Sequence, residues 1–496
     1  MCVDPTTENS PKRDNNENSY GSILKGTSIF GGVQIFQILI NLLRGKFIAI
    51  FLGPQGMGVA SLFTSSYQAI SNTASLGLNL AFIKEVAVNK DDPRGLSTVM
   101  KVAGVLLQAT GLLGALACAL LSPWLSEWSF GSKDFTWQYL LLSVAVYLNV
   151  AGFGKIALLQ GLHRIKIISF SSLAGALSGL LAGVPLYYFF GTLGIVPALI
   201  VLSLTTYVCY SIGLRRAIPH RPVRFTWQSH KPLVKKMFSI GIIMLAATLI
   251  NSFCNYGINI FIRYFGDMAD VGLFSASNSI TLQYSGVVFT AMAMDYFPRL
   301  TAAANDRQKM TMIVNRQMEI VALIAAPLTI LLVGTAPVVI RLLLTEEFIS
   351  SLPLFRWLAA AILLKAIAYP LGYITFAKDN RRLFFWLEAV ACNALYLGLS
   401  LIFYYNYGLI GLGYAAVTEQ AACIILYLGV NYGVYRLHPA RNAAMETLVA
   451  ICFGAAAFFA SFDRFEAFSY YLLAALFMVS AIRSFVTLRS LIFKKL

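Results

Sequence analysis

Apolar runs recur along this chain of 496 residues from one end to the other. Each run holds about 20 residues, the length that a helix needs to cross a hydrocarbon layer about 30 Å thick. The runs are continuous rather than alternating, which favours helices over the strands of a closed barrel. We therefore predict an all-α membrane protein with about 14 transmembrane helices. The predicted spans are 24–52, 57–83, 96–122, 136–160, 165–189, 192–213, 237–264, 268–297, 312–342, 353–377, 382–405, 408–435, 444–461 and 466–488.

The composition argues against a soluble protein. Charged residues make up 12% of the chain, against about 25% in an average soluble domain. The net charge of +16 would suggest nucleic acid as the partner of a soluble protein. In a membrane protein the same excess reflects cationic cytoplasmic loops, so we expect no nucleic-acid partner. Residues 1–22 are polar and contain no apolar segment, which predicts a cytoplasmic tail rather than a cleavable signal peptide.

Basic residues gather in every second loop between the predicted spans. Their cations are Lys84, Lys90, Arg94, Arg164, Lys166, Arg215, Arg216, Arg221, Arg224, Lys231, Lys235, Lys236, Arg299, Arg307, Lys309, Lys378, Arg381, Arg382, Arg436 and Arg441. The intervening loops are short, and their main cations are Lys133, Arg341 and Arg464. Because basic loops stay in the cytoplasm, we expect a multi-pass protein of the cell inner membrane with both termini cytoplasmic.

Short sequence patterns recur in the two halves of the chain. YYFFGTLGIVPA from Tyr187 to Ala198 corresponds to YYNYGLIGLGYA from Tyr404 to Ala415. The order and sense are the same, which predicts two parallel six-helix repeats followed by two C-terminal helices. The predicted parts are a polar tail, 1–22; an N-terminal bundle, 23–213; a basic cytoplasmic linker, 214–236; a C-terminal bundle, 237–436; and two extra helices with a basic tail, 437–496.

Four predicted spans carry polar residues at helical spacing, where apolar residues would cost less. These stripes are Gln34, Gln37, Asn41 and Arg44; Gln68, Asn72, Ser75 and Asn79; Asn251, Asn255, Asn259 and Arg263; and Asn278, Thr281 and Ser285. Each set falls on one helix face, and the stripes occupy equivalent spans of the two repeats. They predict one polar cavity shared by the two halves. The alternative is that these amides only bond neighbouring helices together.

Ionisable residues at membrane depth are Arg44, Lys155, Lys365, Glu388 and Glu419. A charge at the bilayer centre costs at least about 2.5–3.5 kcal/mol, so such residues normally face a wet interior and carry function. Lys155 has an alternative explanation, because its long side chain could reach the cytoplasmic interface. Lys365 lies in the middle of its span, where that explanation fails.

The sequence does not indicate an enzyme. It contains no GxxxxGK[ST] loop for ATP, and no outer loop is long enough to form a catalytic platform. The four histidines lie in predicted loops without ligand spacing, and the seven cysteines form no pairing framework. We therefore expect no cofactor, no metal site and no disulfide.

Two stretches of the sequence carry a family resemblance. RGKFIAIFLGPQGMGVASLFTSSYQ, from Arg44 to Gln68, precedes LGLNLAFIKEVA, from Leu76 to Ala87. The LGPxGxG element at Leu52–Gly58 is the most specific part. Together they resemble the polysaccharide-transporter branch of the MOP superfamily, the Wzx-type flippases of lipid-linked oligosaccharides. The resemblance implies alternating access, a cationic central cavity, and a hydrophobic groove near the last two helices for the lipid tail.

The functional hypothesis is a flippase that moves a polyprenyl-diphosphate-linked oligosaccharide from the inner to the outer leaflet. The substrate would be a repeat unit of O-antigen, capsule or exopolysaccharide. The predicted cavity residues are Gln37, Asn41, Arg44, Gln68, Asn72, Asn79, Lys155, Asn251, Asn255, Asn259, Arg263, Asn278 and Lys365. Glu388 and Glu419 are candidates for coupling to protons or sodium ions.

Two alternatives remain open from the sequence. One is a cation-coupled multidrug or metabolite exporter of the same superfamily, and the other is a non-transporting scaffold of a glycan-synthesis complex. The candidate partners are the lipid-linked oligosaccharide, membrane lipids, and the polysaccharide polymerase and chain-length proteins.

Overall fold

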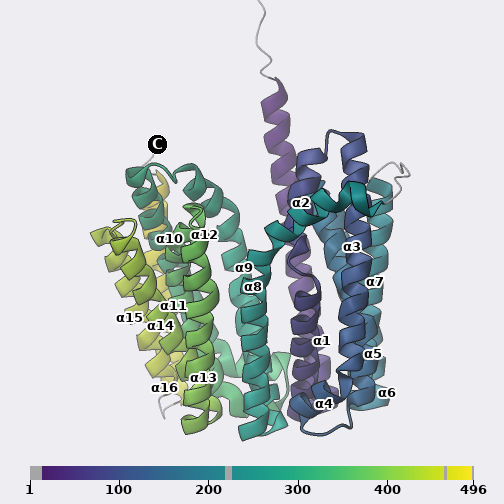
Figure 1. Cartoon of the computed structure of the whole chain (residues 1–496). Coiled ribbons are helices and arrows are strands. Elements are labelled where there is room, and N and C mark those ends of the chain that lie inside the picture. The colour runs from purple at the N-terminus through teal and green to yellow at the C-terminus, as the bar shows by residue number, and fades with distance from the viewer. Residues whose placement is uncertain (1–13, 218–225, 463–465, 494–496) are drawn as a thin grey trace, which may run out of the picture.

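The computed structural model describes residues 14–217, 226–462 and 466–493. Within these ranges the chain consists of helices and short connections, and no strand is present (Figure 1). The prediction of an all-α membrane protein is therefore confirmed.

The first half of the chain comprises α1 to α7. Its helices are α1 Asp14–Ala74, α2 Leu78–Asn89, α3 Pro93–Leu120, α4 Ser122–Phe130, α5 Thr136–Gly161, α6 Ile165–Phe190 and α7 Ile195–Ala217, with the short turn η1 Gly191–Gly194 before α7. α1 holds the first predicted span and most of the second, joined at a kink. Gly53 has φ 62° there and Pro54 follows it, so the chain reverses at a residue that needs no Cβ and at one that cannot donate to the helix.

The second half comprises α8 to α14, and two further helices follow. The elements are α8 Trp227–Phe265, α9 Met268–Ala302, α10 Arg307–Leu343, η2 Glu346–Ser351, α11 Leu352–Ala377, α12 Arg381–Phe384, η3 Phe385–Cys392, α13 Asn393–Tyr407, α14 Leu409–Gly433, α15 Arg441–Ser461 and α16 Glu466–Phe493. The predicted span 382–405 is interrupted by η3, a π-helical stretch. Such stretches are rare and occur mostly at functional sites.

Eleven segments of the described residues are long and apolar enough to cross a membrane. Gly32–Ala74 overlaps two of the predicted spans, and Ile165–Ala217 contains two others. The predicted span 268–297, which α9 forms, is not among the eleven. The chain is therefore a multi-pass membrane protein, while the count of fourteen spans stays a prediction.

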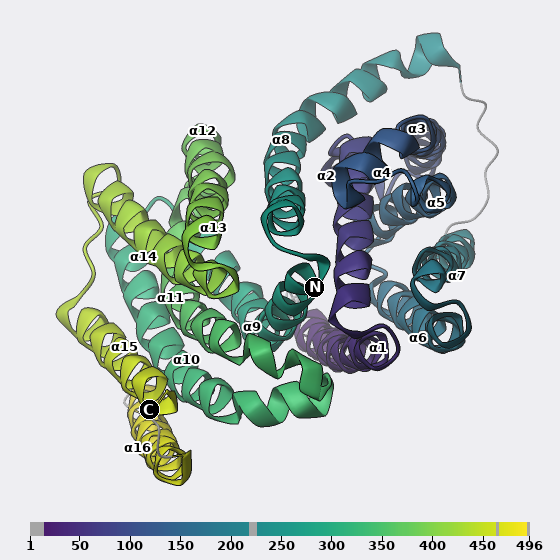
Figure 2. The ribbon, with the colours of Figure 1, turned by 90° about the horizontal axis from the view of Figure 1, so that it is seen from below.

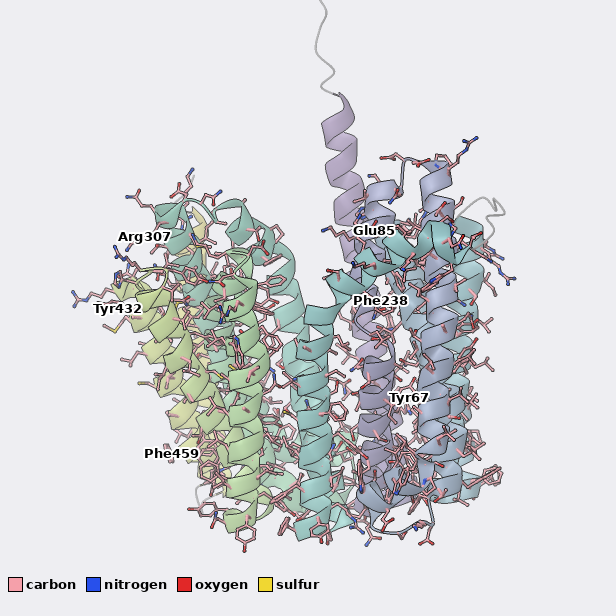
Figure 3. The ribbon with its side chains drawn as sticks, viewed as in Figure 1. Tyr67, Glu85, Phe238, Arg307, Tyr432 and Phe459 are labelled. Carbon is pink, nitrogen blue, oxygen red and sulfur yellow. The ribbon has the colours of Figure 1, made fainter. Side chains whose placement is uncertain are left out.

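The helices form two groups that lie side by side. Figure 2 shows α1 to α7 on one side and α9 to α14 on the other, with α15 and α16 beside α10. We call the end that carries the connections 90–92 and 303–306 the basic end, where Arg307 lies in Figure 3. The opposite end, which carries α4, is called the far end (Figure 1). The predicted domain boundaries stay predictions.

The two halves touch closely at the far end through glycines of α1 and α9. A Cβ on Gly58 would overlap the carbonyl oxygen of Met268, and a Cβ on Gly272 would overlap that of Pro54. We call this contact the glycine seam. It gives a physical reason for the glycines of the LGPxGxG element, because one of them makes the reversal and another permits backbone-to-backbone contact between the halves.

α8 joins the two halves, because it begins against the first half and continues into the second (Figure 2). Val234 and Met237 are buried in one core cluster with residues of α2, α3 and α5. The Lys236 ammonium lies 2.7 Å from a carboxylate oxygen of Glu85, which belongs to α2. The basic-end part of α8 is thus fixed to the first half, although the rest of α8 lines the second.

Candidate substrate cavity

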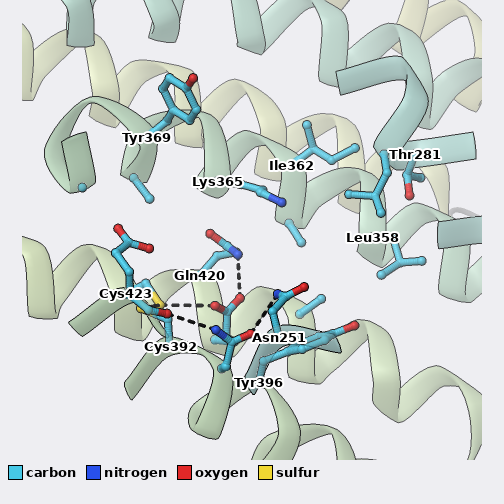
Figure 4. A pocket seen from close by; sticks show the side chains of 18 of the residues that line it. Asn251, Thr281, Leu358, Ile362, Lys365, Tyr369, Cys392, Tyr396, Gln420 and Cys423 are labelled. Atoms are coloured by element: carbon cyan, nitrogen blue, oxygen red, sulfur yellow. Dashed lines mark hydrogen bonds between the residues drawn. The ribbon is translucent and has the colours of Figure 1, made fainter. Parts of the chain in front are cut away.

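A cavity of about 530 Å³ lies inside the second half, between α8, α9, α11, η3, α13 and α14. Its polar lining residues are Asn251, Asn255, Asn278, Thr281, Lys365, Glu388, Asn393, Glu419 and Gln420. Lys365 lies about midway along α11 and Glu419 near the middle of α14, so the cavity lies at membrane depth. Figure 4 shows Lys365 reaching into it from one wall and Asn251 and Gln420 facing it from the other.

Asn251 and Asn255 of α8 both line this cavity, and their spacing of four residues puts them on one helix face. Asn251 Nδ2 donates to Asn393 Oδ1 at 3.0 Å, and Asn255 Nδ2 donates to the Asn251 carbonyl at 2.8 Å. Both side chains remain exposed to the cavity. Each amide carries two donors and one acceptor oxygen, so part of this capacity remains for a ligand.

The charged groups of the cavity are one ammonium and two carboxylates. Lys365 interacts electrostatically with both Glu388 and Glu419. Glu419 accepts a hydrogen bond of 2.6 Å from Gln420 Nε2 and one of 3.2 Å from Cys423 Sγ. The lining contains two acidic residues and one basic residue, so its formal charge is negative. It therefore differs from the cationic cavity that the family resemblance implies.

The π-helical stretch η3 shapes one wall of the cavity. Glu388 lies within η3 and Asn393 directly follows it. Asn393 Nδ2 donates to the Glu388 carbonyl at 3.1 Å. A regular α-helix would turn residues five apart about 140° away from each other. The wider π turn brings both side chains to the cavity.

Two free cysteines line the cavity beside the carboxylates. Cys392 and Cys423 have their sulfur atoms 3.0 Å apart, and both side chains are buried. They come from η3 and α14, so their proximity depends on helix packing, and the sequence gives no signal for it.

The polar stripe residues of the first half do not line this cavity. Arg44 Nε donates to Tyr187 Oη at 3.3 Å, and Asn72 Nδ2 donates to Ser252 Oγ of α8 at 2.8 Å. The remaining predicted residues of α1 and α2 are half-buried or exposed: Gln37, Asn41, Gln68 and Asn79. The described lining comes from residues 251–427 alone, so a cavity shared by both halves stays a prediction.

Three more predicted cavity residues lie elsewhere. Lys155 donates to Ser211 Oγ, and its ammonium lies 3.4 Å from the ring centre of Tyr207, within the first half. Arg263 donates to the Phe130 carbonyl at the far end. Asn259 is buried, and its Oδ1 has no hydrogen-bond partner. Contact between these residues and a substrate stays a prediction.

Several polar groups of the structure were not predicted from the sequence. Asn393 and Gln420 line the cavity. Arg483 of α16 and Glu446 of α15 form an ion pair of 2.6 Å, mostly withdrawn from solvent. The sequence does hold a signal for this ion pair, because two consecutive apolar spans contain charged residues of opposite sign. Arg356 of α11 has a buried Nε atom without a partner and lies 5.2 Å from the Phe462 ring.

Comparisons with known proteins agree on one family and one fold. A family model described as polysaccharide biosynthesis protein matches residues 47–353. The lipid III flippase of Escherichia coli (strain K12) is 25% identical over 428 residues, which cover 85% of this chain and 100% of that protein.

Solved structures show the same fold at low sequence identity. The lipid II flippase MurJ in its inward closed conformation has a TM-score of 0.70 at 12% identity, covering 95% of this chain and 99% of that one. An inward-facing MATE-family multidrug resistance transporter of the MOP superfamily has a TM-score of 0.69 at 18% identity, covering 82% and 97%. The expected resemblance to the MOP superfamily is confirmed.

Proposed function

Because the chain belongs to the polysaccharide biosynthesis protein family, we propose that it moves a lipid-linked oligosaccharide across the membrane by alternating access. The observation that carries this proposal is the polar cavity at membrane depth within the second half. The names of its relatives support it, since one flips lipid III and another flips lipid II. These relatives also agree with the expectation that the chain is a transporter rather than an enzyme.

The physical problem is the transfer of sugar hydroxyls through hydrocarbon. Each unpaired hydroxyl costs about 4–8 kcal/mol in an apolar medium, so several sugars cost tens. The amides of Asn251, Asn255 and Asn278 offer donors and acceptors in place of water. A cavity of about 530 Å³ is comparable with sites for drug-sized ligands, so it accommodates part of a head group rather than a long glycan.

Lys365 is the cavity group suited to the diphosphate that links sugar to lipid. An ammonium forms charge-assisted hydrogen bonds to phosphate oxygens. The same ammonium also attracts Glu388 and Glu419, so the carboxylates and the diphosphate compete for it. Uptake of a proton or sodium ion by either carboxylate would free Lys365 for the substrate. This competition gives ion coupling a physical route.

The direction of transport follows from the proposed orientation. With the basic end in the cytoplasm, the membrane potential favours outward movement of an anion by about 2.3 kcal/mol per charge per 100 mV. Within this proposal the substrate is an O-antigen, capsule or exopolysaccharide repeat unit in the bacterial inner membrane. A polymerase and chain-length proteins would then use the product on the outer side.

The test is the leaflet distribution of a labelled lipid-linked oligosaccharide in vesicles that contain the purified full chain. We expect the wild type to expose the sugar to an external lectin and Lys365→Gln to slow this about tenfold or more, since hydrogen bonds to charged groups contribute about 1.5–3 kcal/mol. The control is Lys101→Gln, which removes an exposed cation of α3. Export of drugs without flipping would favour the exporter alternative, and no transport by the wild type would favour the scaffold.

A further inference from the structure

A second hollow, of about 670 Å³, lies at the basic end, outside the substrate cavity. It is formed by the first turns of α10 and by the connection between α14 and α15. Arg307, Arg316 and Arg436 converge on it together with His438. We call it the arginine pocket. Figure 3 shows Arg307 and Tyr432 on this side of the molecule.

The pocket is held in shape by bonds between its two walls. The Arg307 guanidinium donates to the Arg436 carbonyl, and the Ala440 amide donates to Asn315 Oδ1 at 2.7 Å. Asn315 Nδ2 in turn reaches the His438 carbonyl at 3.5 Å. Because Arg307 and Asn315 both belong to α10, the connection before α15 is fixed over the start of that helix.

The charges around the pocket favour an anion. All three arginines are exposed, and the acidic residue in the lining is Glu319, which is half-buried and interacts electrostatically with Arg316. Asp306 lies nearby, but its carboxylate caps α10 and faces Lys309 at 3.5 Å. Guanidinium groups present a planar fork that matches phosphate oxygens.

The start of α15 adds to the positive charge at the pocket. α15 begins at Arg441, directly after the lining residue Ala440. No side chain caps the start of α15. Helix N-termini carry partial positive charge and free amide groups, which favour phosphate.

An apolar flank borders the arginines. Met312 lines the pocket beside the arginines and is 48% exposed. The Tyr432 ring packs edge-on against His438 at 4.9 Å. A membrane protein with cations directly beside exposed apolar side chains fits a ligand that has a phosphate head and an apolar tail.

We propose that the arginine pocket binds the phosphate group of a lipid in the leaflet at the basic end. The phosphate has two sources, an anionic phospholipid or the diphosphate of a polyprenyl-linked substrate. The first would anchor the protein in its lipid surroundings and is independent of the flippase proposal. The second rests on the proposed function, because it places a waiting substrate outside the cavity.

The experiment measures lipid binding to the purified full chain by native mass spectrometry. The probes are phosphatidylglycerol, phosphatidylcholine, polyprenyl diphosphate and inorganic diphosphate. The test variant is R307Q/R316Q/R436Q. The matched control, K90Q/R94Q/K101Q, removes three exposed cations at the same end of the first half. Arg307 also holds the connection in place, so Arg316→Gln alone is the second test variant. The hydrogen bonds that join the two walls come from Arg307, Asn315 and Ala440 instead.

We expect the triple variant to bind phosphatidylglycerol or polyprenyl diphosphate about tenfold more weakly or worse, given the attraction of each cation for anionic lipid. Arg316→Gln should show a smaller loss of the same kind, and the control should stay within about twofold. Preference for phosphatidylglycerol identifies the phospholipid source, and preference for polyprenyl diphosphate identifies the substrate. Equal binding by test and control variants would overturn the proposal, as would inorganic diphosphate binding as tightly as either lipid.

A separate readout distinguishes failure of this proposal from failure of the proposed function. If the arginine pocket is unnecessary but the chain flips, R307Q/R316Q/R436Q transports normally and binds lipid normally. If the chain does not flip at all, binding of phosphatidylglycerol or polyprenyl diphosphate to the purified chain still depends on the three arginines. The two results therefore do not mimic each other.

Discussion

In the first half, several polar groups at membrane depth are bonded to one another. Tyr67 shares a hydrogen bond of 2.8 Å with Ser203 and accepts another from Asn149, while Lys155 donates to Ser211. In the second half, Lys365 and Asn255 instead border a cavity with capacity to spare. One half thus resembles a rigid support and the other holds the site, although the chain repeats its pattern in both.

The two halves differ in what borders the space between their helices. In the first half Tyr139, Tyr187 and Tyr210 are almost fully buried, whereas in the second half the buried Tyr427 borders the cavity. In the second half Gly372 borders the cavity, and a Cβ there would lie 2.6 Å from Glu388 Oε1. Repeats of equal topology can therefore differ in whether they border a cavity.

The largest expected effect comes from breaking the contact between the halves. Gly272→Val would drive its side chain into the backbone of Pro54 and Gly58. Overpacking of this kind typically costs about 1–3 kcal/mol and occasionally more. We expect a clear drop in the thermal unfolding midpoint and loss of transport. Gly286→Val, on the same helix, is the control, since among the described residues no atom lies within 4 Å of a Cβ at that position. Equal midpoints for the two variants would contradict the glycine seam.

The next effect tests whether the halves differ in function. Asn255→Leu removes a cavity donor, and we expect transport to fall roughly tenfold with little change in stability, as for a lost hydrogen bond to substrate. Asn149→Leu removes the donor to Tyr67 in the first half. Its cost should appear as a lower unfolding midpoint, while the folded fraction transports normally. The comparison fails if both variants lose transport to the same degree.

A smaller effect concerns ion coupling in the second half. We expect Glu388→Gln and Glu419→Gln to transport at a reduced rate that no longer responds to a proton or sodium gradient. The reason is that a neutral amide neither takes up a proton or sodium ion nor attracts the Lys365 ammonium by charge. Glu127→Gln at the far end is the control, because its carboxylate is exposed and forms only a long ion pair with Lys133, at 3.9 Å. A gradient response in both cavity variants would remove these carboxylates from the mechanism.

Much of the fold could be read from the sequence, because span length and apolar runs are imposed by the bilayer itself. The boundary between the predicted spans 24–52 and 57–83, within the LGPxGxG element, also coincides with the observed kink at Gly53. The site was only partly predictable. Spacing puts Asn72 on a polar helix face, but only the packing of the helices decides that its amide bonds to Ser252 instead of lining a cavity. The π turn that aligns Glu388 with Asn393 breaks the 3.6-residue period on which such reasoning depends.

The smallest expected effect concerns the attachment of α8 to the first half. Lys236 is 56% exposed, whereas its partner Glu85 is 3% exposed. Removing the partner of a fully buried charge costs about 3–5 kcal/mol, but solvent around Lys236 screens this pair, so we expect about 1 kcal/mol for Lys236→Gln. The change should lower the unfolding midpoint slightly and leave cavity binding intact. Lys235→Gln, on the exposed neighbour, is the control. A full loss of transport in Lys236→Gln with an unchanged midpoint would mean that α8 transmits motion between the halves, and the first half would then be more than a support.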